Sequence, residues 1–292
     1  MEKIGIVVDE ADDLPKEMAE RHQIAIVPVK LDWPEIENLP GENTFQKMRE
    51  LEKRGIKSFG KTSQPSPKDF LDKYKEQFQR FEKIISITIT SKLSGTYNSA
   101  IQAKNFLKPE EKDRVFVVDS LNASGGEALL ALKAVDLIKS GKEIEEIVRE
   151  LEKFVPQIHT YIIFNDPKWI EASGRISPLV ANLLKRLIKV GIRSLLTFKN
   201  GLLVPAGMKT GAKDIPITLF RKFEKENKKM EKEQKRVRIV ITHGDDPEGA
   251  ERLKEMIEKE FKNVEFAFIN IINNIVGVVA GPNSLVLAWC EV

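Results

Sequence analysis

Short apolar runs alternate with longer amphipathic stretches along the whole chain. The runs have the length of β-strands, and several are apolar at consecutive positions, as in strands that are covered on both faces. The expected strands are residues 4–8, 24–29, 84–90, 115–119, 161–164, 192–198, 237–242, 264–271 and 284–290. Strands that alternate with helices predict an α/β fold, and the doubly apolar runs predict mainly parallel sheets.

Turn and cap residues mark several ends of these elements. Ser66-Pro67-Lys68-Asp69 supplies an N-cap hydroxyl, a first-turn proline and an acid, and so predicts a helix start. Gly141 follows a helical pattern and is a candidate for the residue after its last turn. Asn200-Gly201 lies between two apolar runs and predicts a hairpin, hence at least one antiparallel edge.

The length of the chain favours two domains. Its 292 residues exceed what one compact core usually holds. Asn165-Asp166-Pro167 interrupts the alternation, so we expect an N-terminal α/β domain at 1–165 and a C-terminal α/β domain at 166–292.

Composition removes several function classes. Hydrophobic residues make up 41% and charged residues 31%, a soluble globular balance. The 47 basic and 44 acidic residues leave a net charge of only +3, which argues against a dedicated nucleic-acid binder. The chain has no run of 18 apolar residues and no signal peptide at its start, so we expect no membrane span and a cytoplasmic protein. Cys290, the single cysteine, has apolar neighbours and is expected to be a buried thiol.

Two hydroxyl-rich segments are the main candidates for chemistry, and they cover residues 61–66 and 91–98. The second segment joins a predicted strand to a predicted helix, an arrangement that gathers N–H and O–H donors for an anion. The candidate donors are the hydroxyls and N–H groups of Thr62, Ser63, Ser94, Gly95 and Thr96. The alternative is a set of caps that satisfies only the backbone, and the sequence leaves both readings open.

Two further segments extend the candidate site. Ser120 and Ser124 follow the predicted strand 115–119, whose carboxyl end would share an edge with its neighbours, although an ordinary turn explains them equally well. Arg175 is flanked by small residues and could bind an oxyanion with two parallel hydrogen bonds, or could be a surface arginine.

Metal and nucleophile sites find little support. His22, His159 and His243 lack the paired spacing of a metal site. The acids Asp9, Asp12 and Asp13 could bind Mg²⁺, but the sequence there is more typical of a helix start. No nucleotide-binding or nucleophile motif occurs. We therefore predict no metal and no catalytic residue.

Two motifs are distinctive in sequence and spacing, Lys-Thr-Ser-Gln-Pro-Ser at 61–66 and Leu-Ser-Gly-Thr-Tyr-Asn-Ser-Ala at 93–100. With these motifs, closely matched and in the right order, the chain resembles the DegV family of bacterial fatty-acid-binding proteins. Weaker matches are residues 8–15, 26–29, 118–120 and 174–176.

This resemblance implies two α/β domains that hold a long-chain fatty acid such as palmitate between them. The N-terminal domain would carry the hydroxyl-rich carboxylate site, with Thr62 and Ser94 as its main donors, and the C-terminal domain would cover the acyl chain in an apolar tunnel. Some family members are carriers that present the acid to a separate fatty acid kinase, which makes the acyl phosphate. No other cofactor is implied.

The chain departs from the family pattern at four positions. Val279 stands where a histidine is common, Lys209 stands where an arginine is common, and Glu10 and Ala11 replace hydroxyl residues. These departures bear on the kinase-coupled role more than on lipid binding.

Two other functions stay open on the sequence alone. One is a phosphotransferase or hydrolase that acts on a small acyl or phosphorylated substrate at the same strand edge. The other is an interaction module that kept the fold and lost the pocket. Chain-length preference and oligomeric state leave no signal in the sequence.

Overall fold

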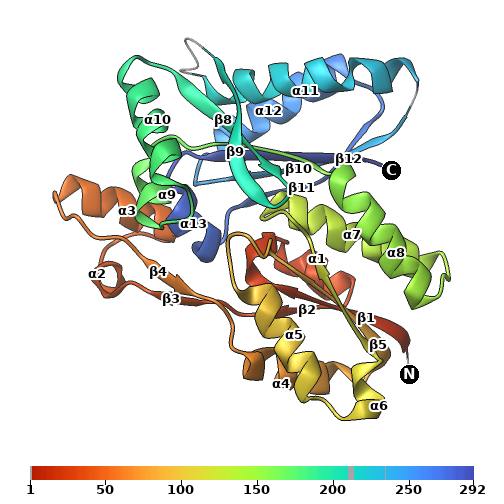
Figure 1. Ribbon diagram of the computed structural model, residues 1–292. Coiled ribbons are helices and arrows are strands. Elements are labelled where there is room, and N and C mark those ends of the chain that lie inside the picture. The colour runs from red at the N-terminus through yellow and green to blue at the C-terminus, as the bar shows by residue number, and fades with distance from the viewer. Residues whose placement is uncertain (1, 210–213, 234) are drawn as a thin grey trace. The chain divides into compact units, whose positions relative to one another are not determined.

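The computed structural model describes residues 2–209, 214–233 and 235–292 (Figure 1). The chain forms two compact units. The first unit comprises Met1–Lys30, Ser63–Ile158 and Asn200–Leu202, and the second comprises Leu31–Thr62, His159–Lys199 and Leu203–Val292. The division therefore differs from the expected single boundary at 165/166, because the segment 31–62 packs into the second unit.

The first unit contains a four-stranded parallel sheet in the order β2-β1-β5-β6. Its strands are β1 (Glu2–Asp9), β2 (Ile24–Val27), β5 (Phe81–Thr88) and β6 (Val115–Asp119). All four were predicted from apolar runs, and the expected parallel pairing is confirmed in this sheet.

Helices cover both faces of this sheet. Helices α4 (Pro67–Gln77) and α5 (Thr96–Phe106) pack side by side on one face, where Phe70 and Tyr74 meet Val7 and Ile84 (Figure 1). Helices α7 (Gly125–Lys139) and α8 (Ile144–Phe154) pack on the other face. The shorter helices are α1 (Lys16–Arg21) and α6 (Pro109–Lys112).

Local signals at the helix ends are confirmed. Ser66 caps α4 by accepting from the Asp69 N–H at 3.2 Å, and the Asp69 carboxylate accepts from the Ser66 N–H at 2.7 Å. Gly141 has a positive φ of 78° after α7, as a residue that ends a helix should.

The second unit contains a six-stranded sheet in the order β11-β10-β12-β7-β8-β9. Its strands are β7 (His159–Ile163), β8 (Arg193–Lys199), β9 (Leu202–Lys209), β10 (Val237–His243), β11 (Val264–Ile271) and β12 (Leu285–Glu291). The pair β10–β11 is parallel, whereas β12 runs antiparallel to both β10 and β7, and β7 runs antiparallel to β8. The α/β class is confirmed, but the mainly parallel arrangement is a property of the first sheet alone.

The sequence predicted parallel strands in the second sheet because helices cover both of its faces, as they do in the first sheet. Tyr161 and Ile163 of β7 point to a core formed with α11 (Ile215–Lys232) and α12 (Pro247–Glu260). Ile162, between them, points to the opposite core. A strand between two cores is apolar at every position whatever its direction, so apolar runs do not reveal strand direction.

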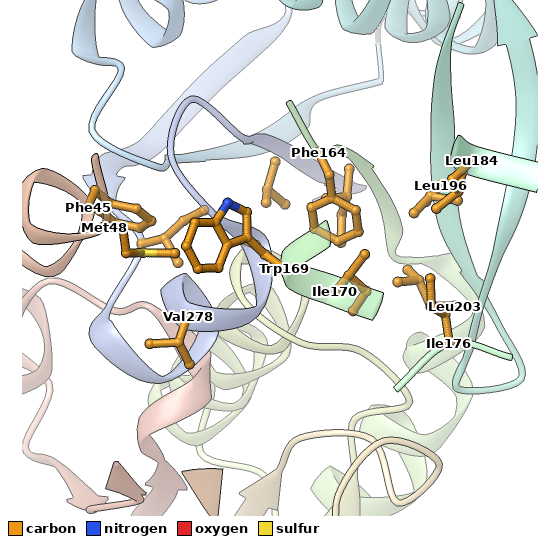
Figure 2. Packing of buried hydrophobic residues seen from close by; sticks show 14 of the residues in the cluster. Phe45, Met48, Phe164, Trp169, Ile170, Ile176, Leu184, Leu196, Leu203 and Val278 are labelled. Atoms are coloured by element: carbon orange, nitrogen blue, oxygen red, sulfur yellow. The ribbon is translucent and has the colours of Figure 1, made fainter. Parts of the chain in front are cut away.

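The opposite core of the second unit gathers side chains from segments far apart in the chain (Figure 2). Trp169 lies at its centre, between Phe45 and Met48 on one side and Ile170 and Phe164 on the other. The contributing helices are α2 (Pro34–Glu37), α3 (Thr44–Lys53), α9 (Lys168–Ala172), α10 (Pro178–Lys189) and α13 (Asn274–Ala280). This core explains why the segment 31–62 belongs to the second unit.

The remaining elements are short. Strands β3 (Lys30–Asp32) and β4 (Lys61–Ser63) form a two-stranded ribbon, and α2 (Pro34–Glu37) follows β3. Asn200 and Gly201, with φ of 49° and 79°, make the predicted hairpin turn. Cys290 is buried, as expected. Within the described ranges, none of the helices has both the length and the apolar character needed to cross a bilayer.

Candidate functional site

The loop that carries Ser94 leaves the first sheet at its topological switch point. Strand β2 lies on one side of β1 and β5 lies on the other, so the order of strands reverses between β1 and β5. Loops diverge at the carboxyl ends of such strands, which is where open α/β sheets bind ligands. The loop 89–95 follows β5 at this point and runs into α5. The sheet topology therefore puts the second hydroxyl-rich segment, residues 91–98, at the edge where such sheets bind ligands.

Ser94 and Thr96 form a short hydroxyl chain in this loop. Their Oγ and Oγ1 atoms are 2.8 Å apart, and the Thr96 N–H also donates to Ser94 Oγ at 3.3 Å. Thr96 is buried, whereas Ser94 is partly exposed. When Thr96 donates its hydroxyl proton to Ser94, the Ser94 proton is left for a ligand. The Thr96 N–H, which we expected to assist the ligand, is instead engaged inside the loop.

Gly95 accommodates the side chain of Gln64. A Cβ atom on Gly95 would lie 1.9 Å from Gln64 Oε1, so only glycine allows this approach. The Gln64 amide also donates to Ser99 Oγ at 3.0 Å. We expected glycine here so that a ligand could reach the main chain, but the close neighbour is the chain's own amide. Gln64 lies in the first recognised motif and is exposed, and its residue type alone did not predict this contact with Gly95.

Ser120 and Ser124 are buried and bonded within the chain. Ser120 Oγ donates to the Asn122 carbonyl at 3.0 Å and accepts from the Asn122 N–H at 3.1 Å, which is a local turn. The Ser124 hydroxyl donates to the Asp13 carboxylate. In this structure both hydroxyls bond within the chain, as in the turn that the sequence left as an alternative, and their role as ligand donors stays a prediction.

Thr62 and Arg175 form a direct pair in the second unit. Arg175 Nη2 donates to Thr62 Oγ1 at 2.6 Å, although 113 positions separate the two residues. Thr62 stands in β4, and Arg175 follows the end of α9. The hydroxyl accepts from a cation, so its own proton is free to point at an anion. Thr62 was expected in the N-terminal domain with Ser94, but it belongs to the second unit. Ser63 is the exposed last residue of β4.

The loop around Arg175 holds the guanidinium in place. Gly174, with φ of 70°, ends α9, and the Arg175 N–H donates to Ser173 Oγ at 3.3 Å. The next residue, Ile176, is buried in the core around Trp169. The backbone on both sides of Arg175 is thus held in place, and the arginine is not a free surface side chain.

Arg175 is a partly buried cation with no carboxylate beside it. Among the described residues, no ion pair within 4.0 Å involves it. Burial lowers the pKa of the guanidinium from its ordinary value, but an arginine keeps its charge in proteins. A partly desolvated cation without an acidic partner among the described residues is a natural anchor for an anionic ligand.

Four carboxyl groups are buried together at the carboxyl edge of the first sheet. Asp9, Asp12, Asp13 and Glu127 are each at most 2% exposed. Burial raises the pKa of Asp9 to about 6 and raises those of Asp12 and Glu127 well above their usual values, and neighbouring carboxylates add to the shift. Sequence reasoning noticed the three aspartates but missed Glu127, since its helical position resembles an ordinary first-turn acid.

These acids do not form a metal site in the structure. Across the part of the chain that is described, no group of three His, Cys, Asp or Glu side chains has an arrangement that could hold a metal ion. Asp9 instead caps the short 3₁₀ turn Glu10–Asp12 by accepting from the Ala11 N–H at 3.0 Å. The helix start predicted at residues 13–15 is confirmed, because α1 begins at Lys16, directly after Pro15.

Comparison with known proteins agrees with this architecture. The family model for DegV matches residues 3–292. The chain belongs to the DegV family. The fatty acid-binding protein of Thermotoga maritima is 30% identical over 97% of this chain and 96% of its own. Protein DegV of Bacillus subtilis is 26% identical over 98% of this chain and 99% of its own.

Solved structures of DegV proteins share the fold. A DegV family protein from Thermus thermophilus, described for its fatty acid binding, has a TM-score of 0.83 at 26% identity and covers 99% of this chain and 100% of its own. A Thermotoga maritima protein described as revealing a fatty acid binding function has a TM-score of 0.78 at 26% identity, with full coverage of both chains.

The positions that depart from the DegV pattern have identifiable surroundings. Val279 lies in α13 and packs, partly buried, against the core around Trp169. Glu10 Oε2 accepts from the Val29 N–H at 2.9 Å, and Ala11 is buried. Lys209 ends β9, and its side chain lies outside the described part of the structure.

Proposed function

We propose that this protein binds a long-chain fatty acid, with the carboxylate held by Arg175, Thr62 and Ser94. The observation that carries the proposal is the Arg175–Thr62 pair, a desolvated cation bonded to a hydroxyl that still has a proton to donate. Relatives named or described as fatty acid-binding proteins support the choice of ligand. The choice of site residues is our own proposal.

The chemistry of the pair suits a carboxylate. Arg175 donates one N–H to Thr62 and keeps further N–H groups for a ligand oxygen. Because Thr62 Oγ1 accepts from a cation, its O–H is polarised and becomes a better donor. Ser94, supported by Thr96, is the third proposed donor. Ser63 and the Gly95 N–H stay secondary candidate donors, because no hydrogen bond described above orients either of them toward a ligand.

The acyl chain is proposed to lie among the apolar side chains of the second unit. The core around Trp169 has partly buried members at its border, among them Phe198, Ile271, Val276 and Val279. Burying about 14 methylenes at ~0.8 kcal/mol each would contribute roughly 11 kcal/mol before the cost of immobilising the ligand. Each hydrogen bond to the carboxylate adds about 1.5–3 kcal/mol. The tail therefore supplies most of the affinity, and the head groups select an acid.

We further propose that the protein is a carrier and not an enzyme. The relatives are named for binding, and no described side chains form a metal centre that would support hydrolysis or phosphoryl transfer. A separate kinase that receives the bound acid is the partner that this role would require. Val279 is an apolar replacement at the position of the family histidine, so such a hand-over would proceed without that imidazole.

Mass spectrometry of the purified, denatured protein tests the proposal directly. We expect a C14–C18 fatty acid to be released, and we expect added palmitate to raise the melting temperature of delipidated protein. Thr62→Val and Ser94→Ala should each weaken palmitate binding by about 10- to 150-fold. Ser140→Ala is the matched control, because Ser140 caps the distant end of α7 through the Leu137 carbonyl. No released lipid and no thermal shift with palmitate would refute the proposal.

A further inference from the structure

The loop that presents Ser94 satisfies most of its backbone donors internally. The N–H groups of Leu93 and Ser94 both donate to the Thr90 carbonyl, at 3.1 and 3.3 Å. The Thr90 N–H donates to the Asn122 carbonyl at 2.8 Å, and the Lys92 N–H donates to Thr90 Oγ1 at 3.2 Å. Two further N–H groups, those of Ile89 and Ser91, donate to carboxylates from neighbouring strand ends.

Asp9 joins the two central strand ends of the first sheet. Its Oδ1 accepts from the Ala11 N–H at 3.0 Å, directly after β1, and its Oδ2 accepts from the Ile89 N–H at 2.8 Å, directly after β5. These strands flank the topological switch point. One carboxylate, at 0% exposure, therefore fixes the start of the Ser94 loop relative to β1.

Asp119 holds the same loop from the other side. It is the last residue of β6, and its carboxylate accepts from the Leu121 N–H at 3.0 Å and from the Ser91 N–H at 3.2 Å. The loop is thus held by two carboxylates, one at Ile89 and the other at Ser91. Neither aspartate has been assigned a role at the binding site so far.

The surroundings of Asp9 raise the free energy of its ionised form relative to its neutral form. The groups that act electrostatically on this region are carboxyls: Glu10 beside Asp9, Asp12 and Asp13 in the next turn, Glu127 on α7, and Asp119 on β6. Burial raises the pKa of Asp9 to about 6, whereas its two backbone hydrogen bonds favour the ionised form. Keeping this buried carboxyl ionised costs free energy that a neutral group would not lose.

We propose that Asp9 is a positioning residue for the Ser94 hydroxyl, and that protonation of Asp9 loosens the Ser94 loop and weakens fatty acid binding. The inference rests on the proposed function for its ligand. The ionised carboxylate accepts from both Ala11 and Ile89, one on each oxygen. The protonated acid carries a hydrogen on one oxygen and accepts less well there, so one of the two contacts weakens.

The sign of the effect follows from these contacts. Above pH 7 Asp9 is ionised, the loop is fixed and the ligand is held tightly. Between pH 7 and pH 5 Asp9 takes up a proton and the grip relaxes. Slightly acidic conditions would therefore favour release of the acid.

The test compares Asp9→Asn with Glu127→Gln. The amide introduced by Asp9→Asn offers one oxygen and one NH₂ group, so it cannot accept from both N–H groups. Glu127→Gln changes an acid of the same cluster to its isosteric amide, but both Glu127 carboxylate oxygens lack a hydrogen-bond partner, so neither is bonded to the loop. Palmitate dissociation constants are measured at half-unit steps from pH 5 to pH 8. Amide exchange of Ile89 is measured in ligand-free protein.

At pH 8 we expect Asp9→Asn to weaken palmitate binding by about tenfold or more and to speed exchange at Ile89, while Glu127→Gln matches the wild type. The ratio of variant to wild-type dissociation constants should fall toward one at pH 5. This ratio cancels the titration of the fatty acid itself. Asp119→Ala, which removes both carboxylate acceptors of the Ser91 N–H, should also weaken binding at pH 8 and guards against a folding defect peculiar to Asp9→Asn.

The outcomes separate this inference from the proposed function. If the wild type binds palmitate and Ser94→Ala weakens binding, but Asp9→Asn shows wild-type affinity at every pH, the positioning role is overturned. If the wild type binds no palmitate, the proposed function fails, and unchanged Ile89 exchange in Asp9→Asn would overturn the positioning role as well.

Discussion

Replacing Arg175 by methionine removes the one cation that the proposed carboxylate site contains. Methionine keeps an unbranched apolar stem, so packing beside Ile176 should persist. The guanidinium reaches Thr62 at 2.6 Å and has no described acid partner. In the ligand-free protein it therefore contributes one hydrogen bond, worth about 1 kcal/mol, against the cost of partial burial. We expect the free energy of unfolding to change by less than about 1 kcal/mol.

The effect on binding should be much larger than the effect on stability. A hydrogen bond between charged partners contributes about 1.5–3 kcal/mol, which corresponds to about 10- to 150-fold in the dissociation constant. Arg175→Lys should recover part of this loss, because lysine keeps the charge but not the planar set of donors. Displacement of a fluorescent fatty acid at pH 8 measures all three proteins, and urea denaturation controls for folding.

Two features of this experiment make it decisive. Methyl palmitate has no carboxylate, so the wild type and Arg175→Met should bind it equally. Thr62→Val and Arg175→Met should also be non-additive, because the arginine acts partly by polarising the threonine hydroxyl. Palmitate affinity within about twofold of wild type in Arg175→Met would refute the assignment of the anion anchor.

Three further predictions concern stability. Because burial raises the pKa of Glu127, the folded state binds a proton more tightly than the unfolded chain, so the free energy of unfolding falls as pH rises above about 4.5. Glu127→Gln should therefore stabilise the protein more at pH 8 than at pH 5. Equal shifts of the urea midpoint at the two pH values would contradict this. Gly95→Ala should displace the flexible Gln64 amide and cost less than about 1 kcal/mol in urea denaturation, whereas a loss above about 3 kcal/mol would mean that Gln64 cannot move. Trp169→Ala should cost about 3–5 kcal/mol by leaving a cavity in the second unit, and a near-native midpoint in guanidinium would argue against that core.

The sequence predicted where the strands and many turns lie, because apolar runs and cap residues act locally. Ser66 with Asp69, and Asn200 with Gly201, form the predicted cap and turn from signals within four residues. Strand direction in the second sheet could not be predicted, since cores on both faces place apolar side chains on both faces of its central strands. The assignment of the segment 31–62 to the second unit depends on long-range packing of Phe45 and Met48 with Trp169, which leaves no local pattern.

The candidate site was predicted less evenly. Arg175 and Thr62 were both singled out from the sequence, but their direct contact spans 113 positions and only the fold reveals it. Ser120 and Ser124 have the same residue type and the same strand-end position as useful donors, yet their hydroxyls are used up by neighbouring backbone and by Asp13. Hydroxyl groups at strand ends form hydrogen bonds either with the chain itself or with a ligand. Which of the two occurs depends on neighbouring groups that the spacing of residues in the sequence does not show.

The interleaved path of the chain has a practical consequence for dissecting the protein. No single cut separates the two units, because 31–62 leaves the first unit's sequence to complete the core around Trp169. An expressed fragment that ends near residue 160 would carry the apolar face of α3 without its cover, and the complementary fragment would lack Phe45, Met48 and Leu51. Neither half should be recovered as a stable product, whereas co-expression of both halves should restore folding, so the gene behaves as one indivisible unit despite encoding two cores.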